Sequence, residues 1–418
     1  MGSKICILIM KFPSAEAGLP EGCENASSIE TLEMVPKFFK AVSLLQQPLE
    51  YLLEECRPNC LVADMMFPWA TKVASKFGIP RLVFHGTSYF ALCASDCLKR
   101  FEPYRSVETD LEPFTVPGLP DKIKLTRLQL PPYAKENSEF SKRMDEISRA
   151  DLESYGVIMN SFHELEPAYS EHYKMVIGRK AWHIGPVSLC NRDTRDKMQR
   201  GGVASIDENE CLRWLAMKKF SSVLYICFGS MSKTDYSVAQ LFEISKALTA
   251  SGQNIIWAVK NGEKTKDVLK IGVAVGAQEW SRHQRKILVK KEEIENAITQ
   301  LMVGEVAEGL RNRTKALKEM ARRATEVEGS SYCDLNALLE DLRAINIGNG
   351  KEPIYGCMIG THDPLVKTSG MRIIQESSVP STANVSDVIR NVDLKWPAAR
   401  SVDMLNIKAA PWEGSRLE

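Results

Sequence analysis

The sequence lacks the long hydrophobic runs, the repeats and the excess of one charge that mark several classes of protein. No apolar run approaches the roughly 18 residues that a membrane-spanning helix needs, and no internal repeat is present. Lys and Arg number 54 and Asp and Glu 53, so the formal net charge is only +1. Such a chain has no overall field to attract nucleic acid or anionic lipid, and we expect small molecules as its ligands.

Cysteine pairs and metal-binding motifs are also missing. The 11 cysteines are odd in number and scattered, and none belongs to a C-x-x-C pair of the kind found in zinc sites. The apolar run near the start is too short for the core of a signal peptide. We therefore expect a cytoplasmic protein without a zinc site of this kind, and we also expect it to be a monomer.

Short apolar runs do occur, and each precedes a segment with helical periodicity. Because these runs are apolar at nearly every position, they are typical of parallel strands that helices cover on both faces. The alternation predicts βαβ units in a doubly wound α/β sheet. The clearest runs lie at 59–65, 79–85, 155–162, 222–230 and 254–260.

The length of 418 residues favours two domains. We assign residues 1–190 to a first domain, 191–210 to a polar, charged linker and 211–344 to a second domain. After residue 344 the chain mixes Gly, Pro and isolated apolar residues without a sustained period. We expect residues 345–418 to be a poorly ordered appendage that adds little to the core.

The second domain should end in helices, because the pattern from 290 to 344 is helical throughout. In the last of these segments, Ser331 and Asp334 have the spacing of a capping box. An apolar stripe follows on one face of the same helix. It consists of Leu335, Leu338, Leu339 and Leu342.

Asp64 is a candidate site residue because it ends the strand-like run "CLVAD". A carboxylate at the C-terminal end of a parallel strand lies at the edge where open α/β sheets bind ligands. The alternative is that Asp64 is the N-cap of a helix that starts near Phe67, since Asp is a good capping residue. The residues alone do not decide between the two.

A second candidate is the loop "FGSMSKT", which leads from a strand into a helix near Val238. Gly229 permits a tight turn, and Ser230 offers a hydroxyl beside backbone amides at a helix N-terminus, which is a ready site for an anion. An ordinary loop with a serine cap explains the pattern too, and the residues alone favour that explanation. Of the six histidines, His85 ends a strand, but we expect it to be a packing residue.

Several long motifs occur together and in order along residues 4 to 344. The chain resembles the plant family 1 UDP-glycosyltransferases, and most of all the branch with scopoletin and flavonol glucosyltransferases. The resemblance implies a GT-B fold, in which two Rossmann-like domains face a cleft. It also implies inverting transfer of glucose from UDP-glucose to a hydroxyl of a small phenolic or flavonoid acceptor, without a metal. The motifs include "CLVADMMFPWATKVASKFGIPRLVFHGTSYFALCAS", "VIMNSFHELEPAYSEHY", "AWHIGPVSLCNRDT" and "SVLYICFGSMS".

Four residues take roles from this resemblance. Asp64 matches the aspartate that orients the catalytic histidine of the family. Thr87 falls near a residue that contacts the transferred sugar. Gly229 and Ser230 match the loop that contacts the donor diphosphate.

The chain departs from the family pattern at three places. Only four residues precede the segment that matches the second strand of relatives, so the histidine base has no counterpart in this sequence. The polar bridge "NGEKTK" stands where relatives carry the signature box that holds the nucleotide sugar, and we interpret the junction between Lys264 and Thr265 as a deletion. Residues 345–418 match nothing in the family. We expect impaired activity, and the alternative is a non-catalytic remnant with at most weak small-molecule binding.

Overall fold

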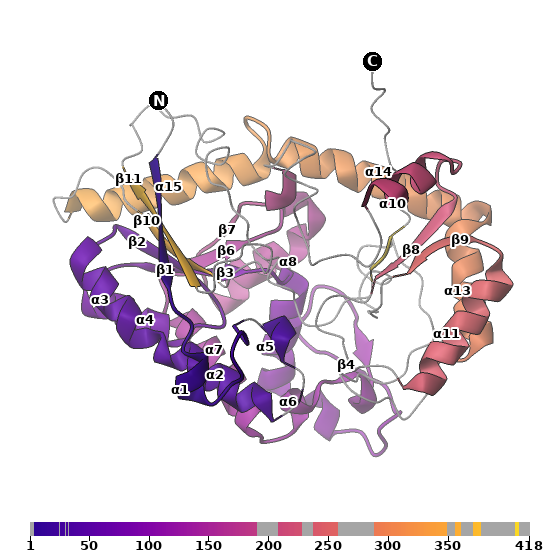
Figure 1. Ribbon diagram of the computed structural model, residues 1–418, viewed down its shortest axis with the longest axis horizontal. Coiled ribbons are helices and arrows are strands. Elements are labelled where there is room, and N and C mark those ends of the chain that lie inside the picture. The colour runs from indigo at the N-terminus through magenta and orange to yellow at the C-terminus, as the bar shows by residue number, and fades with distance from the viewer. Residues whose placement is uncertain are drawn as a thin grey trace.

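A computed structural model describes most of the chain up to residue 348 and three short stretches beyond it. The described ranges are 4–189 apart from positions 25, 30 and 32, then 208–227, 237–257, 288–348, 356–360, 371–377 and 406–408. They form a seven-stranded sheet, a three-stranded sheet and a small two-stranded sheet, all with helices around them (Figure 1). The predicted α/β class is therefore confirmed.

The larger sheet has the order β1-β11-β10-β2-β3-β6-β7. β2, β3, β6 and β7 are parallel neighbours in that order, as the apolar runs predict. Asp64 is the register partner of Phe84, and His85 of Met159, so the strands end at one common edge. The strands are β1 (Lys4–Met10), β2 (Cys60–Asp64), β3 (Arg81–His85), β6 (Gly156–Met159), β7 (Ala181–His183), β10 (Gly356–Gly360) and β11 (Met371–Ser377).

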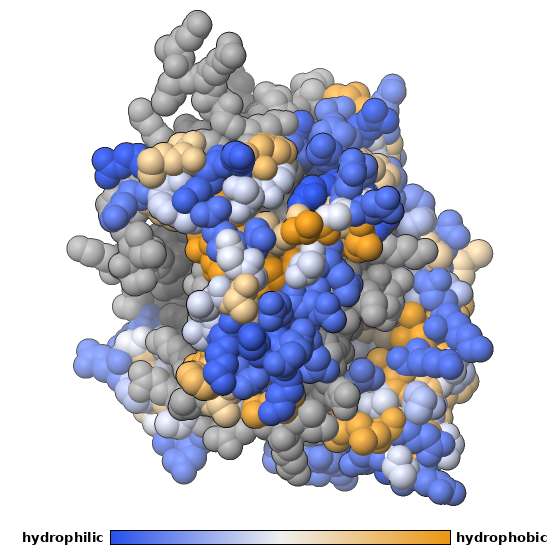
Figure 2. Space-filling model, turned by 90° about the vertical axis from the view of Figure 1, so that its right-hand side faces the viewer, coloured by the Kyte–Doolittle hydropathy of each residue, from blue (hydrophilic) through white to orange (hydrophobic). Residues whose placement is uncertain are grey.

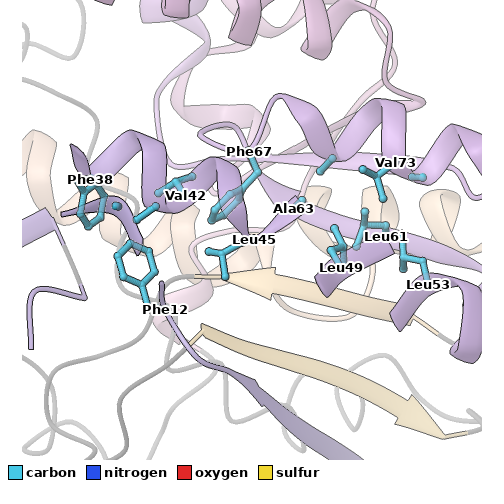
Figure 3. Close-up of a cluster of buried hydrophobic side chains, with 14 of the residues drawn as sticks. Phe12, Phe38, Val42, Leu45, Leu49, Leu53, Leu61, Ala63, Phe67 and Val73 are labelled. Atoms are coloured by element: carbon cyan, nitrogen blue, oxygen red, sulfur yellow. The ribbon is translucent and has the colours of Figure 1, made fainter. Parts of the chain in front are cut away.

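Helices connect these strands and bury one face of the sheet. In Figure 3, Leu61 and Ala63 of β2 lie among aromatic and aliphatic side chains of the helices that precede and follow this strand. The helices of this domain are α1 (Ser14–Ala17), α2 (Met34–Leu44), α3 (Gln46–Cys56), α4 (Trp69–Lys76), α5 (Tyr89–Phe101), α6 (Pro132–Lys135), α7 (Glu139–Leu152) and α8 (Pro167–His172). A small sheet of β4 (Phe114–Thr115) and β5 (Lys124–Leu125) lies between α5 and α6 in the chain.

The opposite face of the large sheet is covered by α15 (Ser330–Gly348), the orange helix at the upper left of Figure 1. Leu338 and Leu342 are buried there against Leu82, Phe84 and Trp182. The predicted leucine stripe is thus real, but it packs on the first domain. The sequence pattern places this helix in the second domain, because an apolar stripe does not indicate which sheet it packs against.

The second domain is built on the sheet β12-β8-β9, in which β8 (Val223–Cys227) and β9 (Asn254–Trp257) are parallel. Its core lies between these strands and two helices and includes Leu224, Ile244, Ile298 and Leu301. Figure 2 views this side of the molecule, where hydrophilic residues cover much of the described surface. The helices are α10 (Glu208–Ala216), α11 (Val238–Ser251), α13 (Lys291–Met302) and α14 (Gly304–Ala324).

Described residues after 344 form strands in the seven-stranded sheet and in the three-stranded sheet, whereas the sequence pattern predicts an appendage. β10 pairs with β2 in parallel, and β11 lies antiparallel between β10 and β1. β12 (Asn406–Lys408) pairs antiparallel with β8 in the smaller sheet. Local periodicity is too weak in these segments to signal strands, so only the pairing reveals them.

Candidate functional site

The candidate site lies where β2, β3 and β6 end, because their parallel register brings the loops that follow them to one edge of the sheet. Asp64 is the last residue of β2, and its Oδ1 accepts a hydrogen bond from the Met66 amide at 2.8 Å. No described residue donates to Oδ2, the other carboxylate oxygen. One oxygen of Asp64 is thus held by the turn while the other is available to a partner.

The capping alternative for Asp64 is wrong. α4 begins at Trp69 with Pro68 at its N-cap position, so Asp64 lies four residues too early to cap this helix. The bond to the Met66 amide is instead a turn of the kind that Asp favours two residues before a backbone N–H. This turn places the carboxylate at the sheet edge.

The surroundings of Asp64 favour its neutral form. Burial raises the pKa of this carboxyl above its usual value of 3.8, and the Met66 hydrogen bond and the nearby His85 and Arg81 only partly oppose the shift. A carboxyl with a raised pKa at a sheet edge is typical of a site that handles protons.

His85 lies beside this edge, but its side chain belongs to a buried hydrogen-bond network with Asp151. Its Nε2 is 3.0 Å from Oδ2 of Asp151, and the residue is 1% exposed. Asp151 also lies 3.4 Å from Arg179, and the contacts with His85 and the charges of Arg179 and Arg81 hold the pKa of Asp151 below its usual range despite burial. These contacts agree with the expectation that His85 is structural.

Arg81 completes the network under the edge. Its guanidinium donates to Oγ1 of Thr71 at 2.6 Å and to the backbone oxygen of Asp64 at 2.9 Å. Burial lowers the pKa of Arg81 to about 10, although Asp151 and Asp64 act in the other direction. Arg81, in β3, therefore fixes the backbone of Asp64 at the end of the neighbouring strand β2.

Thr87 follows β3 and stands at the same edge as Asp64. Its Oγ1 is buried and has no hydrogen-bond partner among the described residues. The next residue, Ser88, caps α5 by accepting from the Ala91 amide at 3.2 Å, and the carboxylate of Glu166 accepts from the Tyr89 amide at 2.9 Å. A buried hydroxyl without a partner is available to a ligand, because buried polar groups normally make hydrogen bonds.

For the predicted donor-binding loop, which carries Gly229 and Ser230, the predicted position cannot be compared with the structure. Gly229 and Ser230 lie outside the described residues, as does the bridge at 261–266. The elements around the loop agree with the prediction, since β8 ends at Cys227 and α11 begins at Val238. Ser237 caps α11 by accepting from the Gln240 amide at 3.1 Å.

Sequence reasoning missed a second histidine–aspartate pair. Nδ1 of His183, at the end of β7, is 2.6 Å from Oδ2 of Asp334 in α15, and the same oxygen accepts from the His183 amide at 2.8 Å. The predicted capping box is thus wrong, because Asp334 and Ser331, which donates to the Gly185 oxygen, both turn toward the first domain. The partners are 151 positions apart, and no local pattern connects them.

Within the described part of the chain, no group of three or more His, Cys, Asp and Glu side chains is placed to hold a metal ion. No described helix is both long enough and apolar enough to cross a membrane. Seven cysteines form no disulfide among the described residues: Cys23, Cys56, Cys60, Cys93, Cys97, Cys211 and Cys333.

Comparisons with known proteins give a consistent result over most of the chain, although no family model matches it. The chain is 42% identical to a scopoletin glucosyltransferase of Nicotiana tabacum over 416 residues, which covers 82% of this chain and 87% of the relative. It is 40% identical to UDP-glucose flavonoid 3-O-glucosyltransferase 7 of Fragaria ananassa, with the same coverage.

Solved structures are similar as well. Glycyrrhiza uralensis UGT73P12, complexed with glycyrrhetinic acid 3-O-monoglucuronide, superposes with a TM-score of 0.74 at 33% identity and covers 82% of this chain and 84% of its own. Medicago truncatula UGT71G1, complexed with UDP-glucose, gives a TM-score of 0.61 at 17% identity and covers 77% and 84%, which supports the fold alone.

Proposed function

Because the chain belongs to the plant UDP-glycosyltransferase family and has its GT-B fold, we propose that it transfers glucose from UDP-glucose to a hydroxyl of a small phenolic or flavonoid acceptor, with inversion. The observation that carries the proposal is the 42% identity to a scopoletin glucosyltransferase over 82% of the chain. A relative named as an anthocyanin 3'-O-beta-glucosyltransferase, from Gentiana triflora, supports the same class of acceptor.

Asp64 is the residue to which we assign a part in proton transfer. An inverting transfer needs the acceptor hydroxyl to lose its proton as the oxygen attacks the sugar, so a base must be positioned there. Asp64 matches the residue that orients such a base in relatives, and its Oδ2 is available to a partner while the Met66 amide fixes Oδ1. A carboxylate in this place holds the ring of a histidine and stabilises the charge that the ring gains.

The donor side of the proposal rests on Thr87, Gly229 and Ser230. The Thr87 hydroxyl, buried and without a described partner, is available to a hydroxyl of the sugar. The loop with Gly229 and Ser230 leads into α11, and backbone amides before a helix suit a diphosphate. These groups bind the donor without a metal. We further propose a cytoplasmic monomer, and the cytoplasmic location is supported by seven cysteines that form no disulfide among the described residues.

The test measures UDP release from UDP-glucose with scopoletin and with a flavonol as acceptors. We expect turnover with at least one of them, and we expect Asp64→Asn to lower the rate by about 100-fold to 10,000-fold, the usual contribution of a positioned base system. Asp145→Asn is the matched control, because Asp145 is exposed and its described ion-pair partner is Lys99. Equal losses in the two variants would show that Asp64 has no special part.

A thermal shift separates catalysis from binding. UDP raises the melting temperature of a chain with a competent donor site by mass action. The absence of both a UDP shift and turnover would contradict the proposal and favour a non-catalytic protein that binds phenols weakly.

A further inference from the structure

Arg143, in the second turn of α7, carries two buried N–H groups without a hydrogen-bond acceptor. They are at Nε and Nη2, and neither nitrogen has a partner among the described residues. Burial lowers the pKa of Arg143, and the charge of Glu146, three positions later in the helix, only partly opposes this shift. Buried polar groups normally make hydrogen bonds, so two neighbouring donors without an acceptor indicate a place for a ligand.

Packing on Phe39 explains only part of this arrangement. The Cζ atom of Arg143 lies over the ring of Phe39, in α2, at 4.4 Å from the ring centre. The face of a ring attracts the cation, but it has no lone pair that an N–H could use. The contact therefore accounts for the position of the guanidinium and leaves both donors without an oxygen acceptor.

Aromatic side chains from three helices lie beside Arg143. Phe140 is one turn earlier on α7, and its ring centre is 6.2 Å from that of Phe39 and 5.4 Å from that of Tyr133 in α6. These three rings, which we call the aromatic group, are all partly buried. Residues three apart on a helix share one face, so the ring of Phe140 and the guanidinium lie on the same side of α7.

The site lies toward the edge of the large sheet at which β2 ends. α7 ends just before β6 begins, and a helix of 14 residues is about 21 Å long, so its first turns reach back to the opposite edge. Packing agrees with this placement. Phe38, which precedes Phe39 in α2, belongs to one buried cluster with Phe67, in the loop that follows Asp64 (Figure 3).

We propose that Arg143 and the aromatic group form a binding site for a planar aromatic carboxylate. The Nε and Nη2 hydrogens lie side by side on one edge of the guanidinium, and this fork matches the two oxygens of a carboxylate. The aromatic group packs against the ring of the ligand. The ligand reaches the fork when a partly buried side chain of the group changes rotamer, a common event on binding.

This site adds a substrate class to the proposed sugar transfer. It rests on the proposed function only in making the ligand an acceptor, because binding needs neither Asp64 nor the donor loop. A hydroxybenzoate or a hydroxycinnamate has the required parts, since each combines a carboxylate, a flat ring and a phenolic hydroxyl. Arg143 then selects acidic phenols over neutral ones of the same shape.

The test measures binding to the full chain by calorimetry, without UDP-glucose. We expect para-hydroxycinnamate to bind at least about tenfold more tightly than its uncharged methyl ester, the effect of hydrogen bonds to a charged group. Arg143→Met should abolish this preference, and Arg143→Lys should keep only part of it, because an ammonium group has no fork. Arg149→Met is the matched control, since Arg149 is exposed on the same helix, and it should keep the full preference.

The affinities decide the proposal. Equal binding of the acid and the ester, no binding of either, or a preference for the acid that survives Arg143→Met would overturn it. Acetate has the carboxylate without the ring and should bind much more weakly than para-hydroxycinnamate. Equal affinity for these two acids would overturn the role of the aromatic group.

A crystal structure of the original chain with para-hydroxycinnamate locates the carboxylate even if the variants do not fold. Its two oxygens within hydrogen-bond distance of Nε and Nη2 of Arg143 would support the proposal, and an acid bound elsewhere would overturn it. The outcome is separate from that of the proposed function. Binding of the acid without UDP release would contradict the transfer alone, whereas UDP release with neutral phenols and no binding of the acid would contradict this site alone.

Discussion

At the scale of single residues, Asp64 combines a cost in stability with a position suited to function. Burial raises the pKa of its carboxyl above 3.8, so the native protein holds the proton more tightly than the unfolded chain does. Stability therefore falls as the pH rises through the interval between the unfolded and the folded pKa, and it stays lower above that interval. A residue kept in spite of such a cost is a good candidate for a functional role.

We predict that Asp64→Asn raises the melting temperature at pH 7 relative to the original chain, because the amide needs no charge in this buried place. The difference should shrink as the pH falls below the unfolded-state pKa, where the carboxyl of Asp64 is protonated in both states. Differential scanning calorimetry at several pH values measures it, with Asp145→Asn as the exposed control. A lower melting temperature for Asp64→Asn at pH 7 would contradict this account of the site.

Asp334 behaves in the opposite way. Hydrogen bonds from His183 keep the pKa of Asp334 low although burial alone would raise it, so its contribution is present above the unfolded pKa and is lost as the pH falls through the folded pKa. We predict that Asp334→Ala costs about 2 kcal/mol in the free energy of unfolding at pH 7, since bonds to charged groups contribute about 1.5 to 3 kcal/mol. Urea denaturation measures this cost.

The control for Asp334 is on the same helix. Asp341 pairs with Lys180 at 2.9 Å, but both side chains are largely exposed, so Asp341→Ala should cost at most about 1 kcal/mol. As the pH falls through the lowered folded-state pKa of Asp334, the cost of Asp334→Ala should decrease, because the carboxyl of the original chain becomes protonated. Equal costs for the two variants would mean that the contact with His183 contributes no more than a surface ion pair.

At the scale of elements, α15 links the two domains. It follows the helices of the second domain in the chain, but it packs on the large sheet of the first domain. Its buried face meets the large sheet through Leu338 and Leu342, and its polar contacts reach the end of β7. The helix directly follows α14 in the chain, with which it also makes contact. A substitution on this buried face of α15 should consequently lower the stability of the first domain.

We predict that Leu338→Ala lowers the free energy of unfolding by about 2 to 5 kcal/mol, as for other buried leucines, because the neighbouring side chains cannot collapse fully into the cavity. Leu339→Ala is the matched control, since Leu339 is only partly buried on the same helix and should cost less. Hydrogen exchange should show faster opening of β7 and β3 in Leu338→Ala. If the amides of β8 and β9 opened first instead, α15 would have to stabilise the second domain.

At the scale of the whole molecule, the donor half of the cleft decides how fast the chain can work. β9 ends at Trp257, and the polar bridge with Lys264 and Thr265 follows in the chain. We predict that turnover of UDP-glucose is well below that of relatives, because a donor that few residues hold is poorly oriented for attack, and orientation accounts for a large part of catalysis.

Restoring the bridge tests this prediction. We expect a chain with the corresponding segment of a close relative inserted between Lys264 and Thr265 to release UDP at least about 100-fold faster. An insertion of the same length with a Gly/Ser composition is the control for the altered loop. Equal rates for the original chain and the restored chain would show that the bridge does not limit activity.

Sequence alone determined the local elements and the class of the fold. The apolar runs at 59–65, 79–85 and 155–162 became β2, β3 and β6, and the helical pattern after 290 became α13, α14 and α15. Asp64 could be placed at a strand end for the same reason. Periodicity reports which face of a segment is apolar, and that is a property of neighbouring residues.

Only the tertiary structure decided which segments meet. His183 and Asp334 form a pair, α15 packs on the first domain, and β10 and β11 fill the large sheet. Each of these contacts joins residues far apart in the chain, and the sequence between them places no restriction on the partner. The apolar face of a helix and the open edge of a strand fit many partners equally well, so their choice depends on the shape and pairing of the assembled fold.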